Sequence, residues 1–405
     1  MESIDEAIPF EIFLEPEVEL SPREQRLVEA AEEESTRFLS MMERRILLSR
    51  LDFETLGRRL RANVLGQDQA VDDLLRFILH YRTGLAEKKG LLSFFAAGPT
   101  GVGKNHLIEM LQQELEDMTG RKTLLEKIEC VNYQNDASLN TILGSWPGYI
   151  NSNMKGKLTR FAEEAAWYPF SFLILDEFEK AHKRLEVALL PILDKGFTAD
   201  HLGRRVDLRG SLLYFTSNIG HELWRRRGVG FKNSSRDEIQ REAVLQAARQ
   251  AFNPEFINRL HIVTFNHLEP ATVERIVERE LGLLGSELKE EFGIDFSWDP
   301  EVTSHLLEVG YSETYGARPI RRAINELVIA PLDQTIHLYG RNAATEQAVE
   351  RVLDTIDQLR QEEKELSTQE AAKLLAHIRR HALPHVGIKR IEVHKERDGL
   401  VFEVR

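Results

Sequence analysis

Short apolar runs alternate with stretches of helical periodicity between residues 60 and 265. Nearly continuous apolar runs of this kind are typical of parallel strands that are covered on both faces of a sheet. Helical spacing is clearest from Asn105 to about Met118, directly after the first run. This alternation predicts a parallel α/β domain. The runs are LLSFFAAG (91–98), FSFLILDE (170–177), GSLLYFTSN (210–218) and HIVTF (261–265).

The segment before this domain has a different pattern. Residues 1–20 are acidic with scattered apolar positions, which favours an extended tail. Ser21, Pro22 and Glu24 have the order of a helix start, with a capping residue, proline in the first turn and glutamate at the third position. Apolar residues then recur at helical spacing to about residue 50. We expect a packing helix at residues 21–50.

The pattern changes again after residue 290. IDFSW (294–298) predicts a strand, and two helices are expected at about 299–309 and 316–338. Residues 341–385 are rich in Glu, Gln and Arg and predict a helical hairpin. IKRIEV (388–393) and GLVFEV (399–404) then flank the dipeptide Asp398-Gly399, a strong signal for a β-hairpin.

These patterns divide the chain into three units. We expect an N-terminal tail and helix at 1–58, a large α/β domain at 59–285, and a smaller, mainly helical domain at 286–405. The smaller domain is expected to end in the β-hairpin and to contain the helical hairpin, at about 341–385, as an insertion.

Composition excludes several functional classes. The chain has 405 residues and a net charge of −13, which disfavours non-specific nucleic-acid binding. No apolar run approaches the roughly 20 residues that span a bilayer. A single cysteine, Cys130, fits a reducing compartment. Because the N-terminus is acidic where a secretory signal is basic and then apolar, we expect a cytoplasmic protein.

The stretch GPTGVGKNHL (98–107) has the form of a phosphate-binding loop, placed between a predicted strand and a predicted helix. Gly98, Gly101 and Gly103 let backbone N–H groups approach phosphate oxygens, and the helix that follows points its positive end at them. Lys104 is expected to reach the β- and γ-phosphates. Asn105 stands where such loops have Ser or Thr, whose hydroxyl ligates Mg²⁺.

A second motif complements this loop. LILDEFEKAH (173–182) is an apolar strand that ends in two carboxylates. Asp176 is expected to hold Mg²⁺ through its water shell, and Glu177 to orient and deprotonate the attacking water. An acidic pair at a strand end is common by itself, but with a phosphate loop upstream it completes the pattern of an NTPase site.

With these two motifs, residues from about 60 to 340 resemble an AAA+ module, and specifically the second ATPase module of the Clp family of unfoldases and disaggregases. VLGQDQAV (64–71) resembles the segment that holds adenine. Asn218 in FTSNIG (215–220) resembles the sensor that positions the attacking water. Arg259 in FNPEFINRL (252–260) resembles the arginine finger, and Arg318 in YGARPIRRAI (315–324) the small-domain arginine that reads the γ-phosphate.

The resemblance implies a cofactor set of ATP and Mg²⁺, and a set of site residues. Asn105 and Asp176 are the expected metal ligands, and Glu177, Asn218, Arg259 and Arg318 the expected catalytic residues. The expected nucleotide-binding residues are Val64, Leu65, Pro99, Thr100, Gly101, Val102, Gly103, Lys104, Asn105 and His106. An arginine finger implies a homo-oligomer with active sites between subunits, either a hexameric ring or a helical filament, and we expect Arg259 to have no role within its own subunit.

Two further segments resemble Clp features that contact proteins. GSWPGYIN (144–151) resembles the pore loop, with Tyr149 and Ile150 expected to grip a polypeptide substrate. The residues after it are polar to basic, whereas Clp modules usually continue with acidic residues and glycine. Val229-Gly230-Phe231 lies where Clp subunits that partner a barrel peptidase carry a docking tripeptide, although an ordinary surface loop explains it equally well.

Asn105 adds a second resemblance, to the torsins, which also read Gly-Lys-Asn here and still bind ATP. The chain departs from the torsin pattern in three ways: it has Arg259, it has the sequence Gly-Ala-Arg in the small-domain motif, and it lacks extra cysteines. The chain therefore resembles a relative between the Clp and torsin groups.

The leading functional hypothesis is an ATP-driven, chaperone-type protein remodeller. One alternative is a nucleotide-gated scaffold with negligible turnover, which Asn105 favours, and another is the unfoldase subunit of a Clp-type protease, which Val229–Phe231 favours. A nucleic-acid motor is disfavoured by charge. We expect ATP to bind and hydrolysis to be slow, because an unadapted Asn ligates Mg²⁺ poorly.

Overall fold

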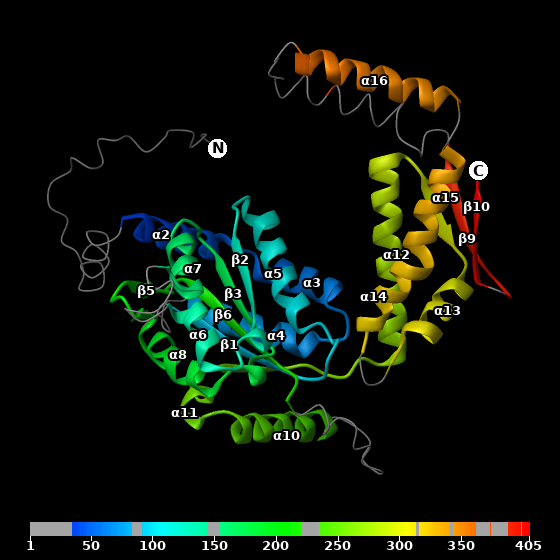
Figure 1. Ribbon diagram of the computed structural model, residues 1–405. Helices are drawn as coiled ribbons and strands as arrows, with labels where there is room; N and C mark the ends of the chain where they lie inside the picture. The colour runs from blue at the N-terminus through cyan, green and yellow to red at the C-terminus, as the bar shows by residue number, and fades with distance from the viewer. Residues whose placement is uncertain are drawn as a thin grey trace, which may run out of the picture.

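The computed structural model describes nine separate stretches of the chain (Figure 1). They are residues 35–82, 91–144, 154–219, 235–312, 316–340, 343–361, 373, 388–397, 399–405 and no others. The helix start expected at Ser21 lies outside these residues, as do the pore-loop positions Tyr149 and Ile150 and the tripeptide Val229-Gly230-Phe231.

The large domain is built on a five-stranded, wholly parallel sheet in the order β2-β3-β6-β1-β7. The four predicted apolar runs form four of its strands, so the parallel α/β prediction is confirmed. The fifth strand, β2, is at one edge and was not predicted. The strands are β1 (Leu92–Ala97), β2 (Leu124–Glu129), β3 (Ser171–Asp176), β6 (Ser211–Ser217) and β7 (His261–Thr264).

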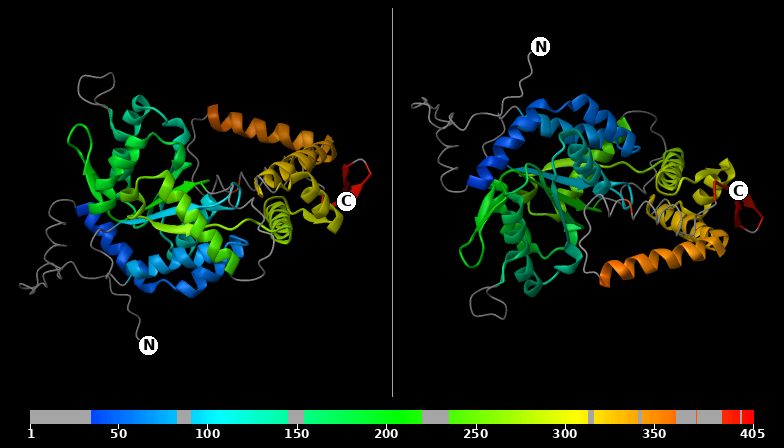
Figure 2. Two further views of the ribbon diagram at one scale, coloured as in Figure 1. Left: turned by 90° about the horizontal axis from the view of Figure 1, so that it is seen from below. Right: turned by 90° about the horizontal axis from the view of Figure 1, so that it is seen from above.

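Helices cover both faces of this sheet, which explains why its inner strands are apolar throughout (Figure 2). On β1, Phe94 and Ala96 pack into one buried cluster, whereas Phe95 and Ala97 pack into the other. None of the described helices is long and apolar enough to cross a membrane. One layer holds α2 (Ser35–Arg50), α3 (Phe53–Asn63), α4 (Asp68–Arg82) and α5 (Lys104–Thr119); the other holds α6 (Asp136–Leu143), α7 (Lys157–Ala165), α8 (Lys183–Lys195), α10 (Ser235–Ala251) and α11 (Pro254–Ile257).

Three small elements complete the large domain. Two are short 3₁₀ turns, at Cys130–Asn132 and at Phe178–Lys180. The third is an antiparallel hairpin of β4 (Phe197–Ala199) and β5 (Arg205–Asp207), which the sequence patterns did not reveal.

Helix α2 docks through buried polar side chains as well as through the apolar residue Leu48. Arg37 and Arg44 are both buried. Arg37 donates a hydrogen bond to the carbonyl oxygen of Ala162 at 2.8 Å, and Arg44 donates to that of Gly210 at 2.6 Å. The guanidinium groups thus satisfy main-chain acceptors that burial would otherwise leave unpaired.

The small domain packs helices against a three-stranded sheet in the order β10-β9-β8. The predicted C-terminal hairpin is confirmed, because β9 and β10 pair in antiparallel register. The helix predicted at 316–338 is interrupted by a π-helical segment at Asn325–Ile329. The elements are α12 (Pro270–Phe292), β8 (Asp295–Trp298), α13 (Pro300–Gly310), α14 (Arg318–Ile324), α15 (Ala330–Gly340), β9 (Arg390–Glu396) and β10 (Gly399–Val404).

The boundaries expected at 58 and 285 both fall inside helices, α3 and α12. Since α12 packs on α13 and β8, the small-domain helices begin at Pro270 rather than near residue 286. The first helix of the expected insertion is α16 (Ala343–Gln361), between α15 and β9. In Figure 1 it lies beyond one end of α12 and α15. The start expected for the second helix, Ser367–Glu370, is outside the described residues.

Candidate functional site: a cavity between the two domains

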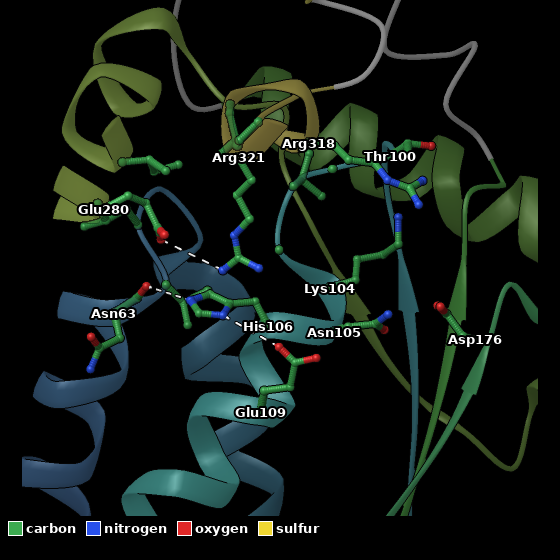
Figure 3. A pocket seen from close by; sticks show the side chains of 18 of the residues that line it. Asn63, Thr100, Lys104, Asn105, His106, Glu109, Asp176, Glu280, Arg318 and Arg321 are labelled. Atoms are coloured by element: carbon green, nitrogen blue, oxygen red, sulfur yellow. Dashed lines mark hydrogen bonds and ion pairs between the residues drawn. The ribbon is translucent and has the colours of Figure 1, made fainter. Parts of the chain in front are cut away.

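A cavity of about 330 Å³ lies between the carboxyl end of the sheet, the start of α5 and the small domain (Figure 3). Its size is in the usual range for small-molecule sites. Although the chain is acidic overall, the cavity lining carries five basic side chains and four acidic ones. The basic ones are Lys104, Lys127, Arg279, Arg318 and Arg321; the acidic ones are Glu109, Asp176, Glu177 and Glu280.

The predicted phosphate loop forms the floor of the cavity. Gly101 and Gly103 adopt left-handed backbone conformations, with φ of 74° and 97°, which side chains with a Cβ rarely reach. Helix α5 begins directly after them, at Lys104. The loop therefore presents the free N–H groups and the positive end of a helix to the cavity, an arrangement that favours phosphate.

The ammonium group of Lys104 is held by three oxygens. It donates to the carbonyl oxygens of Gly98 at 2.8 Å and Pro99 at 2.6 Å, and to the side-chain oxygen of Asn218 at 2.8 Å. Burial lowers the pKa of Lys104 to about 8, against the opposing charges of the nearby carboxylates. An anion bound next to the ammonium group would stabilise its protonated form and raise the pKa of Lys104 again.

Asp176 ends β3 beside Lys104. Thr216 donates to one of its oxygens at 2.5 Å, and the ammonium group of Lys127 lies 2.7 Å from the other. Burial acts to raise the pKa of this carboxyl, but hydrogen bonds from Lys127, Thr216 and Asn105 outweigh it and the pKa is lowered. Asp176 is thus held as a carboxylate.

Asn105 lies next to Asp176 in the cavity lining (Figure 3). Its side-chain oxygen is buried and has no hydrogen-bond partner among the described residues. A buried polar atom without a partner is uncommon and calls for an explanation, such as a ligand. Amide and carboxylate oxygens are the hard ligands that Mg²⁺ prefers, so this pair of side chains fits a magnesium ion.

Glu177 follows Asp176 in a strained conformation. It has a φ of 51°, the one positive value found among the described residues that are not glycine. Strain of this kind clusters at functional sites. The side-chain nitrogen of Asn218 lies 3.5 Å from a Glu177 carboxylate oxygen, while the oxygen of the same amide accepts from Lys104. Asn218 therefore contacts both groups.

The small domain closes the cavity. Arg318 and Arg321 line it from successive turns of α14, and a guanidinium nitrogen of Arg321 lies 3.9 Å from a carboxylate oxygen of Glu280 on α12 (Figure 3). The N–H of Ala317 donates to the carbonyl oxygen of Gly101 at 3.1 Å. This bond joins the small domain directly to the phosphate loop.

Four apolar side chains also line the cavity: Val64, Leu65, Leu268 and Ile276. His106 lies on the side away from Asp176 (Figure 3), with its Nε2 atom 3.2 Å from the carbonyl oxygen of Asn63. The combination of an apolar wall and main-chain polar groups suits a planar base at one end of a chain of phosphates.

Arg259 does not line the cavity, and the expectation that it has no role within its own subunit is wrong. It forms a two-pronged ion pair with Asp194 of α8, at 2.6 and 2.9 Å, and a further contact with Glu255 at 3.2 Å. Hydrogen bonding to Asp194 raises the pKa of Arg259. The guanidinium is therefore already paired in the protomer.

Most residues selected from the sequence converge on this one cavity. Pro99 contributes its carbonyl oxygen to Lys104 without lining the cavity itself. Arg259 lies elsewhere on the large domain. The residues brought together at the cavity are Val64, Leu65, Thr100, Gly101, Val102, Gly103, Lys104, Asn105, His106, Asp176, Glu177, Asn218 and Arg318.

Five charged lining residues were missed: Lys127, Glu109, Arg279, Glu280 and Arg321. Glu109 belongs to α5, three residues after His106. Lys127 belongs to the edge strand β2. Charged residues interrupt the apolar positions of this strand, so it does not form an apolar run and was not predicted. Arg321 follows Arg318 by one helical turn, so helical spacing would have placed both on one face. Helix α12 supplies the other two, and its sequence carries no signal for them.

Comparison with known proteins yields two family models that match this architecture. An AAA domain of the Cdc48 subfamily matches residues 89–263. The C-terminal, D2-small domain of ClpB matches residues 268–349. The two matches agree with the predicted fold class, a large parallel α/β domain followed by a mainly helical small domain.

Curated relatives give the same result. A Bacillus subtilis protein described as negative regulator of genetic competence ClpC/MecB is 36% identical over 277 residues, 66% of this chain and 33% of its own. The chaperone protein ClpB of Lactiplantibacillus plantarum is 35% identical over 290 residues, 71% of this chain and 32% of its own. The chain thus spans about a third of the length of these relatives.

A solved structure of a complex between Hsp104 of S. cerevisiae and casein is similar over 71% of this chain and 49% of that one. The TM-score is 0.61 and the sequence identity is 27%. A second Hsp104 structure, 22% identical with a TM-score of 0.63, covers 88% of this chain and supports the fold.

Proposed function

Since the chain carries an AAA+ ATPase module of the Clp/Hsp100 second-module type, we propose that it binds ATP with Mg²⁺ and hydrolyses it slowly to remodel proteins. The observation that carries this proposal is the convergence of Lys104, Asp176, Glu177, Asn218 and Arg318 on one cavity. Phosphoryl transfer needs mainly positioning and charge neutralisation, and these groups supply both.

Each side chain has a distinct part in this proposal. Lys104 and Arg318 neutralise the charge of the triphosphate from opposite sides of the cavity. Glu177 orients a water molecule and accepts its proton. Asn218, which contacts both Lys104 and Glu177, keeps the two groups in register.

Asn105 and Asp176 are the residues that would hold Mg²⁺, which when bound neutralises charge on the phosphate oxygens. Asp176 is fixed as a carboxylate by Thr216, and the side chain of Asn105, whose oxygen has no partner among the described residues, lies next to it. The torsin-like sequence Gly103-Lys104-Asn105 is therefore proposed to be a working variant of the phosphate loop, with altered metal contacts.

The proposed assembly is a head-to-tail oligomer, either a closed ring or a helical filament. Arg259 does not line the cavity of its own subunit, so it acts in catalysis only if it reaches a neighbour's. To reach a neighbouring subunit, Arg259 would have to break its ion pair with Asp194, or move together with Asp194 and α8. Each active site is then shared between two subunits.

A polypeptide is the proposed substrate, and the similar solved structure of Hsp104 in complex with casein supports this class. We expect Tyr149→Ala to spare ATP hydrolysis and to abolish remodelling of an unfolded model protein such as casein. An aromatic ring that grips a chain acts on the substrate and not on the phosphates. The measurement is fluorescence loss of a tagged substrate beside phosphate release, with Tyr168→Ala as the matched aromatic control.

Remodelling by Tyr149→Ala at the wild-type rate would contradict the threading role. Complete loss of ATP hydrolysis in the same variant would show instead that the loop supports the active site.

Asn105→Thr is expected to leave ATP affinity little changed and to raise turnover. Most phosphate binding comes from backbone N–H groups and Lys104, which the substitution leaves intact. A threonine hydroxyl meets the octahedral geometry of Mg²⁺ better than the longer amide does. A recovered metal contact of about 2–4 kcal/mol in the transition state corresponds to roughly 30- to 1000-fold in kcat.

Calorimetry of ATP binding and phosphate release, measured on both proteins, tests this expectation. Absence of ATP binding by the wild-type protein would refute the proposed function as a whole. Equal or lower turnover in Asn105→Thr would show that the site has adapted to the amide and that its rate is not limited by the missing hydroxyl.

A further inference from the structure

Lys127 occupies a place at the nucleotide cavity that no motif assigns. It extends from the edge strand β2 toward the carboxyl end of β3, and its ammonium nitrogen lies 2.7 Å from Asp176 Oδ2. A second carboxylate, Glu129, is 3.8 Å away. The side chain is about one-third exposed, and it is part of the cavity lining. Lys127 is therefore a fixed positive charge at the carboxylate expected to hold magnesium.

The two partners stabilise each other's charged forms. Burial acts to lower the pKa of Lys127, but the hydrogen bond and charge of Asp176 raise it overall. The pKa of Asp176 is lowered, with Lys127 as the leading cause that opposes burial. Both groups are charged at neutral pH.

Both oxygens of Asp176 already have a partner within the protein. Thr216 occupies one oxygen at 2.5 Å and Lys127 the other at 2.7 Å. A divalent cation at this carboxylate would meet the ammonium group as a like charge a few ångströms away. Of the expected metal ligands, the oxygen of Asn105 is the atom that stays without a partner.

We propose that Lys127 is a built-in counter-cation of the nucleotide site, which competes with Mg²⁺ for Asp176 and supports ATP binding without the metal. This inference rests on the proposed function, because it concerns the same cavity. It assigns to Lys127 the control of how strongly nucleotide binding depends on Mg²⁺. Lys127 is a positioning residue in this role, since it acts through Asp176 and through the charge of the cavity.

The arrangement has two opposite consequences. Without metal, the ammonium group offsets the charge of Asp176, which would otherwise repel the triphosphate. With metal, the same ammonium group weakens the ion's hold on Asp176. Groups that contact a metal's ligands change metal affinity by about 10- to 100-fold, and we expect an effect of this size here.

The experiment compares ATP affinity in excess EDTA with ATP affinity in excess Mg²⁺, by calorimetry on the full chain. All proteins carry Glu177→Gln so that ATP is not consumed. The readout is the ratio of the two dissociation constants. For Lys127→Met we expect weaker binding in EDTA, equal or tighter binding in Mg²⁺, and a ratio about 10- to 100-fold larger than with Lys127 in place.

Two further variants separate charge from packing. Lys127→Gln keeps a donor for Asp176 and removes the charge, so its ratio is expected to follow Lys127→Met. Lys127→Arg keeps the charge, so its ratio of dissociation constants is expected to stay close to that of the protein with Lys127. Lys155→Met is the matched control, because Lys155 pairs with Glu163 at 2.7 Å and does not line the cavity.

The inference would be overturned if the ratio of the two dissociation constants were the same in the protein with Lys127, in Lys127→Met and in Lys127→Gln. The proposed function would then remain intact. If the protein with Lys127 binds ATP in neither condition, the proposed function fails and this inference fails with it. If Lys127→Met does not fold, judged by its thermal unfolding midpoint, Lys127→Gln and Lys127→Arg decide the result.

Discussion

Glu177→Gln is expected to lower ATP turnover by about 10²–10⁴-fold, the usual contribution of a positioned general base. Gln has the shape of Glu but cannot accept the proton of the attacking water. Gln keeps the contact with Asn218, and the phosphate loop is unchanged, so ATP affinity should be preserved. Phosphate release and ATP calorimetry measure the two quantities, with Glu163→Gln as a surface control.

The same variant should accumulate in the assembled state, because ATP binds and is not consumed. Light scattering at micromolar protein concentration measures this directly. A monomer in the presence of saturating ATP would contradict a shared active site. Turnover close to that of the wild type would remove Glu177 from its proposed role and favour another base.

Arg259→Ala is expected to reduce turnover by about 10³-fold or more, the size of effect that arginine fingers have in NTPases. ATP affinity should hardly change, because Arg259 does not line the cavity of its own subunit. Arg249→Ala on the exposed face of α10 is the matched control. Loss of the Asp194 ion pair is a second effect of the substitution, so thermal unfolding is measured in parallel.

Asp194→Asn separates these two effects of Arg259→Ala. It removes the ion pair and leaves the guanidinium in place. If Arg259 acts on a neighbour, Asp194→Asn retains most of the turnover that Arg259→Ala loses. Equal losses in both variants would show that Arg259 serves the fold of its own subunit through Asp194.

The strands of the large domain were predictable where burial on both faces made them apolar. β1, β3 and β6 are inner strands of the sheet and read as continuous apolar runs. β2 is an edge strand with a half-exposed pattern, and its sequence LLEKIE gives no clear period. Because β2 was missed, Lys127 was missed too, although its ammonium nitrogen lies 2.7 Å from the predicted metal ligand Asp176.

The site residues could be predicted where short sequence motifs specify their chemistry. Lys104 and Asp176 converge because a phosphate loop and a strand end meet at the same edge of a parallel sheet. The partners of Arg259 and Arg44 could not be predicted, since both depend on contacts far apart in sequence. α2 shows the limit of periodicity, because two arginines are buried against the domain together with Leu48, and the apolar pattern does not predict them.

The central claim is that each active site uses Glu177 of one subunit and Arg259 of the next. Mixing the two inactive variants, Glu177→Gln and Arg259→Ala, tests it most directly. At an interface where an Arg259→Ala subunit offers its intact Glu177 to the intact Arg259 of a Glu177→Gln neighbour, a complete site forms. Random head-to-tail mixing makes about a quarter of interfaces complete.

The measurement is therefore the ATP turnover of an equimolar mixture, refolded or exchanged until light scattering shows mixed oligomers. The account predicts recovery to about a quarter of wild-type turnover, far above either variant alone. A mixture of confirmed mixed oligomers that stays as inactive as its parts would contradict the shared site.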